Sequence, residues 1–371
     1  MSAEFGPRLR ALLTERDMTL RGTARALNYN VAYISRVANG RQRPSVQLAE
    51  ALDELLQADG ELVRLSTPVT PLDEPTGPAS DIAHMKASAE HILKHADRYG
   101  GDAVAPVAVQ VWQSAQRRLD AGEIPESAQR GYVAAVAEAA EVAGWLLFDS
   151  GDRVAARNAF LESHMLARHA GERAMEWFAL DMLAMLDTEC GRPGGVRRIT
   201  DELLSQSRIP PRVALLARVR RGRALAQTGD RQRALADLDA ARGGVEESLS
   251  SRDPEWAWWV NQQEIVGHSG HALLSLADLN AAILKFQSAL AHATPRGVML
   301  YRIELLHSYA RAKAWGKAEE EIHEIGPLLS TITSGRNRLL LREALKVVDR
   351  ASGVPVGLSA LVRHTAATIS P

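Results

Sequence analysis

The fold is decided by residues 19–45, which read TLRGTARALNYNVAYISRVANGRQRPS. This stretch predicts two short helices joined by a tight turn. The apolar residues of the first helix recur at the i, i+4, i+7 spacing of one buried face: Leu20, Ala24 and Leu27. Thr19 is a candidate N-cap, because its hydroxyl can accept a hydrogen bond from a first-turn amide. Asn28 then falls where the chain must turn sharply, in the left-handed conformation that Asn tolerates better than most residues.

The second helix of this stretch carries the features of a nucleic-acid-binding element. Asn30 is its candidate N-cap, Ile34 and Val37 are its buried positions, and Asn39-Gly40 ends it with a left-handed residue. Its outward face carries Val31, Ala32, Tyr33 and Arg36. The stretch holds Arg21, Arg25, Arg36, Arg41 and Arg43 and no acidic residue, so its charge is roughly +5 in a chain of net charge −1. Such a local basic surface predicts contact with DNA phosphates.

The pattern T-L-x-x-x-A-x-x-L-N-x-N-x-x-Y-I-S-R-x-x-N-G-R-x-x-P-S resembles the phage-repressor-like (XRE) helix-turn-helix family, over about residues 4–65. The resemblance implies a DNA-binding domain at residues 1–65 that recognises a double-stranded operator. It places four residues at base-reading positions: Val31, Ala32, Tyr33 and Arg36. It places four more against the DNA backbone: Asn30, Asn39, Arg41 and Arg43, and the basic Arg21 is added to this predicted surface. The turn departs from the family, which usually has Gly where this chain has Asn28. A protein-interaction module built on the same fold is the alternative.

Length and composition predict a folded helical protein of two or three domains. The chain has 371 residues, of which 46% are hydrophobic, 24% charged and 5% aromatic. The single cysteine, Cys190, excludes an internal disulfide framework and fits a reducing cytosol. No apolar run is expected to span a membrane, since Ala103–Val111 is too short and contains Pro106. With no signal-peptide pattern at the N-terminus, the predicted location is the cytoplasm.

The chain divides at residues 66–80, STPVTPLDEPTGPAS, where four prolines predict a partly extended linker. Before the linker, helices expected at residues 4–16 and 46–56, with a last turn to residue 65, complete a domain of about five helices. After it, residues 81–371 show helical periodicity and no sustained strand alternation, so the predicted fold class is all-α. Helices are expected at both ends of this region: Asp81–Tyr99, Ala103–Ala121 and Asn337–Ala351.

A repeated pattern, G-D-x-x-x-A-x-x-x-F, organises the second region. It occurs at Gly151–Phe160, Gly229–Leu238 and Ala277–Phe286, with a weaker copy at Lys313–Ile322 and a degenerate one at Gly191–Thr200. Another glycine stands seven residues before three of these anchors: Gly144, Gly222 and Gly270. A small residue there lets the two helices of a hairpin cross closely, and the Gly-Asp pair makes the turn between them.

This pattern resembles the tetratricopeptide repeat over roughly residues 130–330. The resemblance implies a right-handed α-solenoid in which the first helix of each hairpin lines a concave binding surface. The predicted ligand-binding residues are Glu138, Glu141, Trp145, Phe178, Asp181, Arg223, Gln227, Asn261, Glu264, His271, His307 and Arg311. Further inward-facing positions are Phe148, Met185, Glu189 and Ile303. Acidic and aromatic residues in the first half and basic residues in the second suit a zwitterionic or peptide-like ligand.

Several alternatives stay open for the charged and aromatic residues of this region. The inward-facing charges can instead pair with one another or meet water. The basic run Arg218–Arg223 is expected to be mostly solvated, since it spreads over several helix faces. The cluster Trp256–Trp259 favours packing between helices over a ligand cage.

The two regions together resemble peptide-sensing regulators of Gram-positive bacteria. The resemblance implies a cytoplasmic transcriptional regulator that acts as a homodimer. Its residues 81–371 would bind a small signalling ligand or peptide and change operator binding by the two DNA-binding domains. Nothing in the sequence predicts an enzyme, a cofactor or a metal site: the phosphate-loop, nucleophile-elbow and zinc-protease motifs are missing, and the paired histidines lack further ligands. The competing function is a DNA-bound scaffold whose repeats hold a protein partner.

Overall fold

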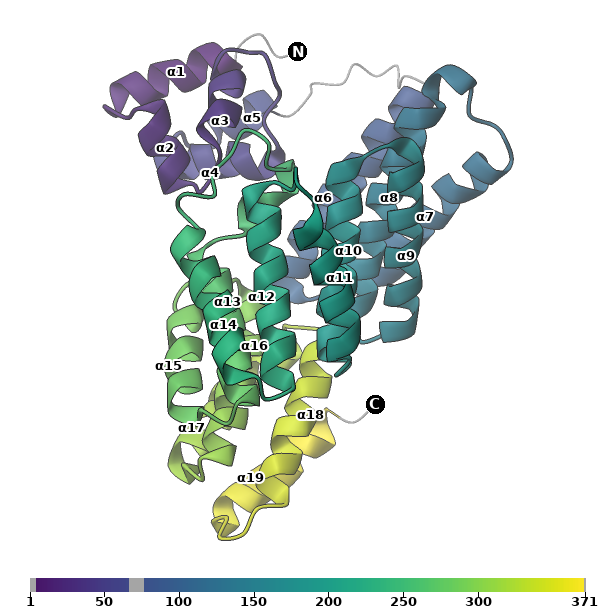
Figure 1. The fold of residues 1–371 in the computed structure, drawn as a ribbon. Helices are drawn as coiled ribbons and strands as arrows, with labels where there is room; N and C mark the ends of the chain where they lie inside the picture. The colour runs from purple at the N-terminus through teal and green to yellow at the C-terminus, as the bar shows by residue number, and fades with distance from the viewer. Residues whose placement is uncertain (1–4, 67–76, 370–371) are drawn as a thin grey trace. The chain divides into compact units, whose positions relative to one another are not determined.

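The computed structural model describes residues 5–66 and 77–369, which are helical with no strand among them. It divides into two compact units (Figure 1). The first unit consists of α1–α5 together with Arg208–Leu215 and Gly244–Asn261. The second takes in residues 77–207, 216–243 and 262–369. The first unit thus contains two segments from far along the chain, which the predicted division at the linker does not include.

Five helices form the N-terminal part of the first unit: α1 (Phe5–Glu15), α2 (Leu20–Ala26), α3 (Val31–Ala38), α4 (Val46–Leu56) and α5 (Glu61–Ser66). The Thr19 hydroxyl accepts a hydrogen bond of 3.0 Å from an amide in the first turn of α2. Asn30 caps α3 in the same way at 2.8 Å. Asn28 has φ 59° and Gly40 has φ 67°, so the predicted caps and left-handed turns are confirmed.

One hydrophobic core joins these five helices. Its members include Ile34 and Val37, as predicted, together with apolar residues of α1 and α4: Phe5, Leu9, Leu12, Leu13, Leu48, Leu52 and Leu56. The buried carboxylate of Asp53 accepts hydrogen bonds from the amides of Gly60 at 2.7 Å and Leu62 at 2.8 Å. These bonds satisfy amides that the start of α5 would otherwise leave without partners, so α5 is anchored to α4.

The second unit is built from helices that follow one another through short turns. Their bounds are α6 (Pro78–Tyr99), α7 (Ala105–Asp120), α8 (Glu126–Asp149), α9 (Arg153–Ala170), α10 (Arg173–Glu189), α11 (Pro193–Ser205), α13 (Arg231–Gly244), α14 (Gln262–Ser275), α15 (Leu279–Leu290), α16 (Pro295–Arg311), α17 (Trp315–Ile325), α18 (Gly335–Asp349) and α19 (Val356–Thr368). Helix α12 (Pro211–Gln227) begins in the first unit and ends in the second. Of the predicted linker, residues 67–76 lie outside the described residues, and α6 already begins at Pro78.

The three repeated glycines lie where the two helices of a hairpin cross. A Cβ atom at each would crowd the large residue of the partner helix: 2.6 Å from Phe160 at Gly144, 3.0 Å from Leu238 at Gly222 and 2.7 Å from Phe286 at Gly270. The turns repeat as well, since Asp152 and Asp278 cap the helices that follow them. The predicted hairpin geometry is therefore present, and the tetratricopeptide identity stays a prediction.

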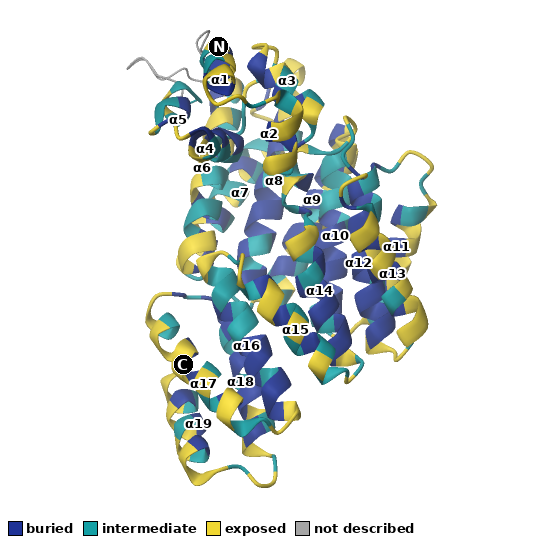
Figure 2. Cartoon of the chain, turned by 90° about the vertical axis from the view of Figure 1, so that its left-hand side faces the viewer, coloured by how far each residue is buried: buried dark blue, intermediate teal, exposed yellow. Residues whose placement is uncertain are grey.

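Helix α8 is long and apolar enough to cross a membrane by length and composition alone. This differs from the expectation that no run in the chain reaches such a length. In the structure 72% of the qualifying window is buried within the protein, and Figure 2 shows α8 largely in the buried colour. Core helices of folded proteins pass the same length and composition test, so the packing of α8 accounts for its composition.

The last helices of the second unit return to its first helices. Helix α16 packs against α6, and α18 packs against α8. The Thr333 amide donates to the Tyr99 carbonyl at 2.7 Å, and the Gly335 amide donates to the Asp102 carboxylate at 2.8 Å. A side chain at Gly335 would collide with the Ser150 carbonyl, so glycine permits this close approach. The inner face of the unit is covered by its own ends, in contrast to the open groove that the solenoid resemblance implies.

Candidate DNA-binding surface and buried charge network

Helix α3 presents most of the predicted DNA-binding residues to solvent. Val31 is 39% exposed, Arg36 is exposed, and Ala32 and Asn30 are half-buried. The flanking predicted residues are exposed too: Arg21, Asn39, Arg41 and Arg43. The Arg36 side chain is oriented by Gln42, whose Oε1 accepts a hydrogen bond of 2.7 Å from the Arg36 Nε. The basic residues lie on α2 (Arg21), in the last turn of α3 (Arg36) and just after α3 (Arg41 and Arg43).

Tyr33 differs from its prediction as a base-reading residue. Its side chain is buried with 8% of its surface exposed, and its hydroxyl accepts a hydrogen bond of 2.9 Å from the Ser45 amide. The physical reason is helical spacing, because Tyr33 stands four residues before the buried Val37 and shares its face. Tyr33 therefore packs beneath the surface and fixes the chain that follows α3.

A cleft of about 50 Å³ adjoins the start of α3 within the first unit. The helix-turn-helix contributes Asn28, Asn30 and Arg36 to its lining, and the two distant segments contribute Arg212, Asp253, Glu255 and Trp258 among others. Trp258 lies in a 3₁₀ turn, η1 (Glu255–Trp259), and stacks on the Tyr29 ring with centroids 6.4 Å apart. Trp258 thus packs on a residue of the helix-turn-helix, where no prediction placed it, while 39% of its surface stays exposed.

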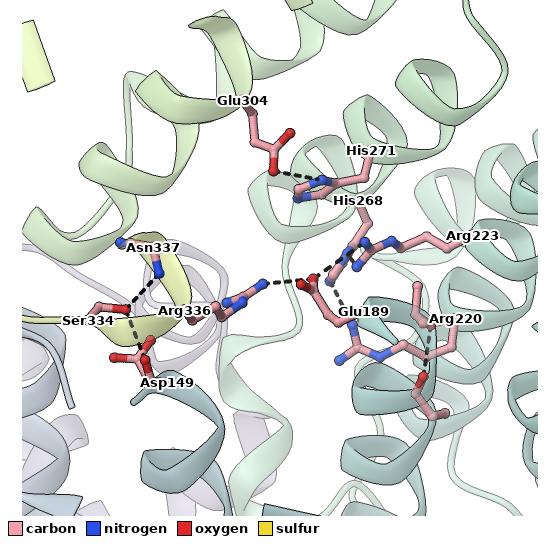
Figure 3. A network of polar contacts seen from close by, with 12 residues as sticks. Asp149, Glu189, Arg220, Arg223, His268, His271, Glu304, Ser334, Arg336 and Asn337 are labelled. Carbon is pink, nitrogen blue, oxygen red and sulfur yellow. Dashed lines mark hydrogen bonds and ion pairs between the residues drawn. The ribbon is translucent and has the colours of Figure 1, made fainter. Parts of the chain in front are cut away.

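The second unit contains a network of buried charges, shown in Figure 3. Glu189 lies between two arginines, 3.6 Å from the Arg223 Nη2 and 3.0 Å from the Arg336 Nη2. All three side chains are less than a tenth exposed, at 6%, 8% and 9%. Burial on its own raises the pKa of Glu189, but Arg336 and Arg223 outweigh burial and hold that pKa well below its usual range. Glu189 is thus the carboxylate that pairs with both guanidinium groups.

Arg220 and His268 extend this network. Arg220 makes a two-pronged ion pair with Asp181, at 2.9 Å and 2.8 Å, and both side chains are buried. The His268 ring contacts Arg220 and Glu264 through Nε2, at 2.9 Å and 3.0 Å, and Arg223 through Nδ1 at 3.3 Å. Burial lowers the pKa of His268 to about 4, so the ring is neutral near pH 7. A neutral imidazole carries one N–H, so neither tautomer satisfies all three contacts.

Two carboxyl groups beside the network hold protons more tightly than usual. Burial, reinforced by Glu138 and Asp181, raises the pKa of Glu141 to about 8. Burial, reinforced by Glu189, raises the pKa of Glu304 to about 7, and its carboxylate lies 3.6 Å from the His271 Nδ1. Near neutral pH both groups can therefore donate a hydrogen bond in their protonated form.

These raised pKa values predict that the second unit loses stability between pH 7 and pH 8. In this window the folded state binds more protons than the unfolded state, whose Glu141 and Glu304 carboxyls have the ordinary value of 4.5, so the free energy of unfolding falls as pH rises. The Glu141→Gln variant keeps the shape of the side chain and removes its ionisable carboxyl group. We expect it to lose about 1 kcal/mol less than the wild type across this window, measured by urea unfolding at both pH values. Identical losses would show that Glu141 titrates normally in the fold.

The network brings together half of the predicted ligand-binding residues: Glu141, Trp145, Asp181, Arg223, Glu264 and His271. Trp145 belongs to it through Arg296, whose guanidinium lies 4.9 Å above the indole. The predicted inward position of Glu189 agrees with the structure as well. Five further members of the network were not predicted as ligand-binding residues: Arg220, His268, Arg296, Glu304 and Arg336. The expectation that the run Arg218–Arg223 is mostly solvated is wrong for Arg220 and Arg223, because positions three apart on α12 share its buried face.

The other predicted ligand-binding residues lie elsewhere. Glu138 lies 3.8 Å from Lys86. Gln227 and Arg311 are exposed and donate hydrogen bonds to the backbone carbonyls of Thr188 and Leu274. The remaining three are Phe178, which packs in an apolar cluster, His307, whose pKa is lowered by burial, and Asn261, which belongs to the first unit.

Residues 4–65 match a family model described as a helix-turn-helix domain. No curated protein matches the chain. Together with the capped α3 and its exposed Arg36, the match shows a helix-turn-helix domain at the N-terminus, which indicates DNA binding, followed by an all-helical region.

Proposed function

We propose that the chain is a cytoplasmic, non-enzymatic transcriptional regulator that binds its operator as a homodimer and responds to a small signalling ligand or peptide. The observation that carries the proposal is the set of exposed arginines on and beside α3 within a matched helix-turn-helix domain. Residues at the start of such a helix contact base edges in the major groove, and the flanking arginines contact phosphates. One domain makes few base contacts, so two domains on half-sites about one helical turn apart give useful affinity.

The buried charge network supports the ligand-binding part of this proposal. The Arg296 and Arg336 Nε atoms are buried and have no hydrogen-bond partner among the described residues. A ligand carboxylate would accept from these donors, and the protonated Glu141 or Glu304 would donate to a peptide carbonyl. Such a ligand competes with the internal ion pairs, so it favours an arrangement of the helices that differs from the ligand-free one. Its entry requires separation of the ends that cover the inner face.

A scaffold that holds a protein partner is the second candidate. It is favoured by an apolar stripe along α9, where Val154, Leu161 and Met165 are exposed by 75%, 46% and 55%. The spacing i, i+7, i+11 places these side chains on one face, and exposed apolar patches mark protein-binding surfaces. Native mass spectrometry separates the two candidates: a dimer that gains a discrete small mass from culture extract supports a sensor, and capture of a protein lost in a Leu161→Asp variant supports the scaffold.

DNA recognition is tested by replacing Arg36. We expect Arg36→Ala in the full-length protein to weaken binding by about tenfold or more to a duplex selected from a random-sequence library, because a base contact of this kind is worth about 1–3 kcal/mol. Discrimination against an unrelated duplex should fall in parallel, measured by fluorescence anisotropy. Arg64→Ala is the matched control, since it removes the same charge from an exposed position on α5. Wild-type affinity in a folded Arg36→Ala variant would show that α3 does not read the operator.

A further inference from the structure

The turn before α3 is held by a residue from far along the chain. Arg212, whose side chain is 2% exposed, donates a hydrogen bond of 2.6 Å from Nη2 to the Asn28 Oδ1 and another of 3.3 Å from Nη1 to the Asn28 carbonyl. The Asn28 Nδ2 donates in turn to the Trp258 carbonyl at 3.1 Å. Arg212 is itself oriented by the Ala257 carbonyl at 3.1 Å. Both polar ends of the Asn28 side chain are thus engaged within the protein.

The segment that contains Trp258 also brings acidic and aromatic side chains to the helix-turn-helix. The Glu255 carboxylate accepts a hydrogen bond of 2.5 Å from the Gln42 Nε2. The Oε1 of the same Gln42 accepts from Arg36 at 2.7 Å, so one side chain links a carboxylate to the predicted base-reading arginine. The Trp258 indole lies nearly parallel to the Tyr29 ring, with an angle of 6° between the planes. Asp253 adds a second carboxylate to the lining of the cleft.

We propose that Arg212 and residues 249–260 form an autoinhibitory clasp that competes with DNA for the start of α3; the proposal rests on the function proposed above. A recognition helix enters the major groove with its N-terminal residues. The clasp contacts the turn that leads into α3, through Asn28 and Tyr29, and it reaches Arg36 through Gln42. DNA phosphates also avoid the exposed Glu255 carboxylate, because like charges repel each other at this range. The clasp must therefore leave α3 before a duplex can bind.

The clasp shares a helix with the buried charge network. Helix α12 carries Arg212 in its first turn and Arg220 and Arg223 further along. A ligand that changes the pairing of Arg220 or Arg223 would act on the helix that also supplies Arg212 to the clasp. Control of DNA binding then requires only that the ligand-bound and ligand-free forms differ in how often the clasp is open.

The test compares wild-type protein with a Glu255→Ala, Trp258→Ala double variant, both full length. A DNA duplex is selected from a random-sequence library with the double variant, and both proteins are titrated against it. We expect the double variant to bind about tenfold or more tightly than the wild type, because apparent affinity falls by the fraction of molecules in the competent state. Glu247→Ala is the control, since it removes one exposed negative charge from the same segment outside the cleft, and it should bind as the wild type does.

The outcomes separate the clasp from the proposed function. Equal binding by wild type and double variant would overturn the clasp and leave DNA recognition standing. Absence of sequence-specific binding in both proteins would overturn the proposed function, and the clasp with it.

A cross-link keeps the proposal testable if the double substitution disturbs folding. Gln42→Cys and Glu255→Cys are combined with Cys190→Ser, and the two new thiols are joined by a short bismaleimide. We expect the cross-linked protein to bind the selected duplex about tenfold or more weakly than the same protein before cross-linking. Prior addition of the duplex should lower the yield of cross-link. Unchanged DNA binding after cross-linking would refute the clasp.

Discussion

Replacing Glu189 by alanine is expected to lower the free energy of unfolding of the second unit by about 3–5 kcal/mol. The side chain is 6% exposed and lies within 3.6 Å of Arg223 and 3.0 Å of Arg336, both also buried. Without Glu189, two guanidinium groups remain in a space from which water is largely excluded, and the nearby Arg220 adds further repulsion to Arg223. Urea unfolding at pH 7, followed by tryptophan fluorescence, measures the loss.

Glu343→Ala provides the matched control for this prediction. Its carboxylate lies on α18 and is 65% exposed, where it pairs with Lys346 at 2.7 Å. Exposed pairs of this kind contribute about 0–1 kcal/mol, so the control should stay close to the wild type. Added formate should stabilise Glu189→Ala more than the wild type, because a small carboxylate can occupy the vacated position. Equal stability of the two alanine variants would mean that the arginines do not rely on Glu189.

The helix-turn-helix could be predicted in detail because its signals are local. The N-caps Thr19 and Asn30 and the left-handed Asn28 each act within one helical turn, where neighbouring residues decide the conformation. The error at Tyr33 concerned a local signal as well, since Tyr33 stands four residues before Val37 and shares its buried face. The Ser45 amide, twelve positions later, then donates a hydrogen bond to the Tyr33 hydroxyl.

The charge network was only partly predictable, because one of its arginines comes from a helix outside the repeats. The position of a residue within the repeat predicts whether it faces inward. On this basis Asp181, Arg223 and Glu264 were predicted to share one surface. The repeat says nothing about α18, which lies outside the repeats and supplies Arg336. The return of that helix depends on the Thr333 to Tyr99 hydrogen bond, between residues that no periodicity connects. The sequence therefore predicted a lined groove, and long-range closure turned it into a buried network.

The clasp could not be predicted from local signals either. Arg212 and Trp258 lie outside the repeated Gly-Asp patterns, and their contacts with Asn28 join residues 184 and 230 positions apart. What marks Arg212 as unusual is its burial near the start of a helix. Burial is known only from the folded structure, so the sequence could not reveal it.

Gly270→Ala is expected to destabilise the second unit by about 1–3 kcal/mol, although alanine is the better helix former. A Cβ atom at this position would lie 2.7 Å from the ring of Phe286, which is fully buried. The control is Gly131→Ala in the second turn of α8, where the nearest atom to a new Cβ is 3.9 Å away. That variant should gain roughly 0.5–1 kcal/mol from helix propensity alone. Urea unfolding of both variants gives the comparison.

The opposite signs of these two effects test the meaning of the repeat. If Gly270 is present because helices cross closely, then Gly270→Ala combined with Phe286→Leu should recover part of the loss, in a double-mutant cycle with a favourable coupling energy. Gly144 occupies the same repeat position against Phe160, so Gly144→Ala should behave like Gly270→Ala. A stabilising Gly270→Ala would mean that the ring yields easily and that the glycine spacing reflects chance. Loss at both glycines, set against gain at Gly131, would establish one packing rule that operates in two separate hairpins.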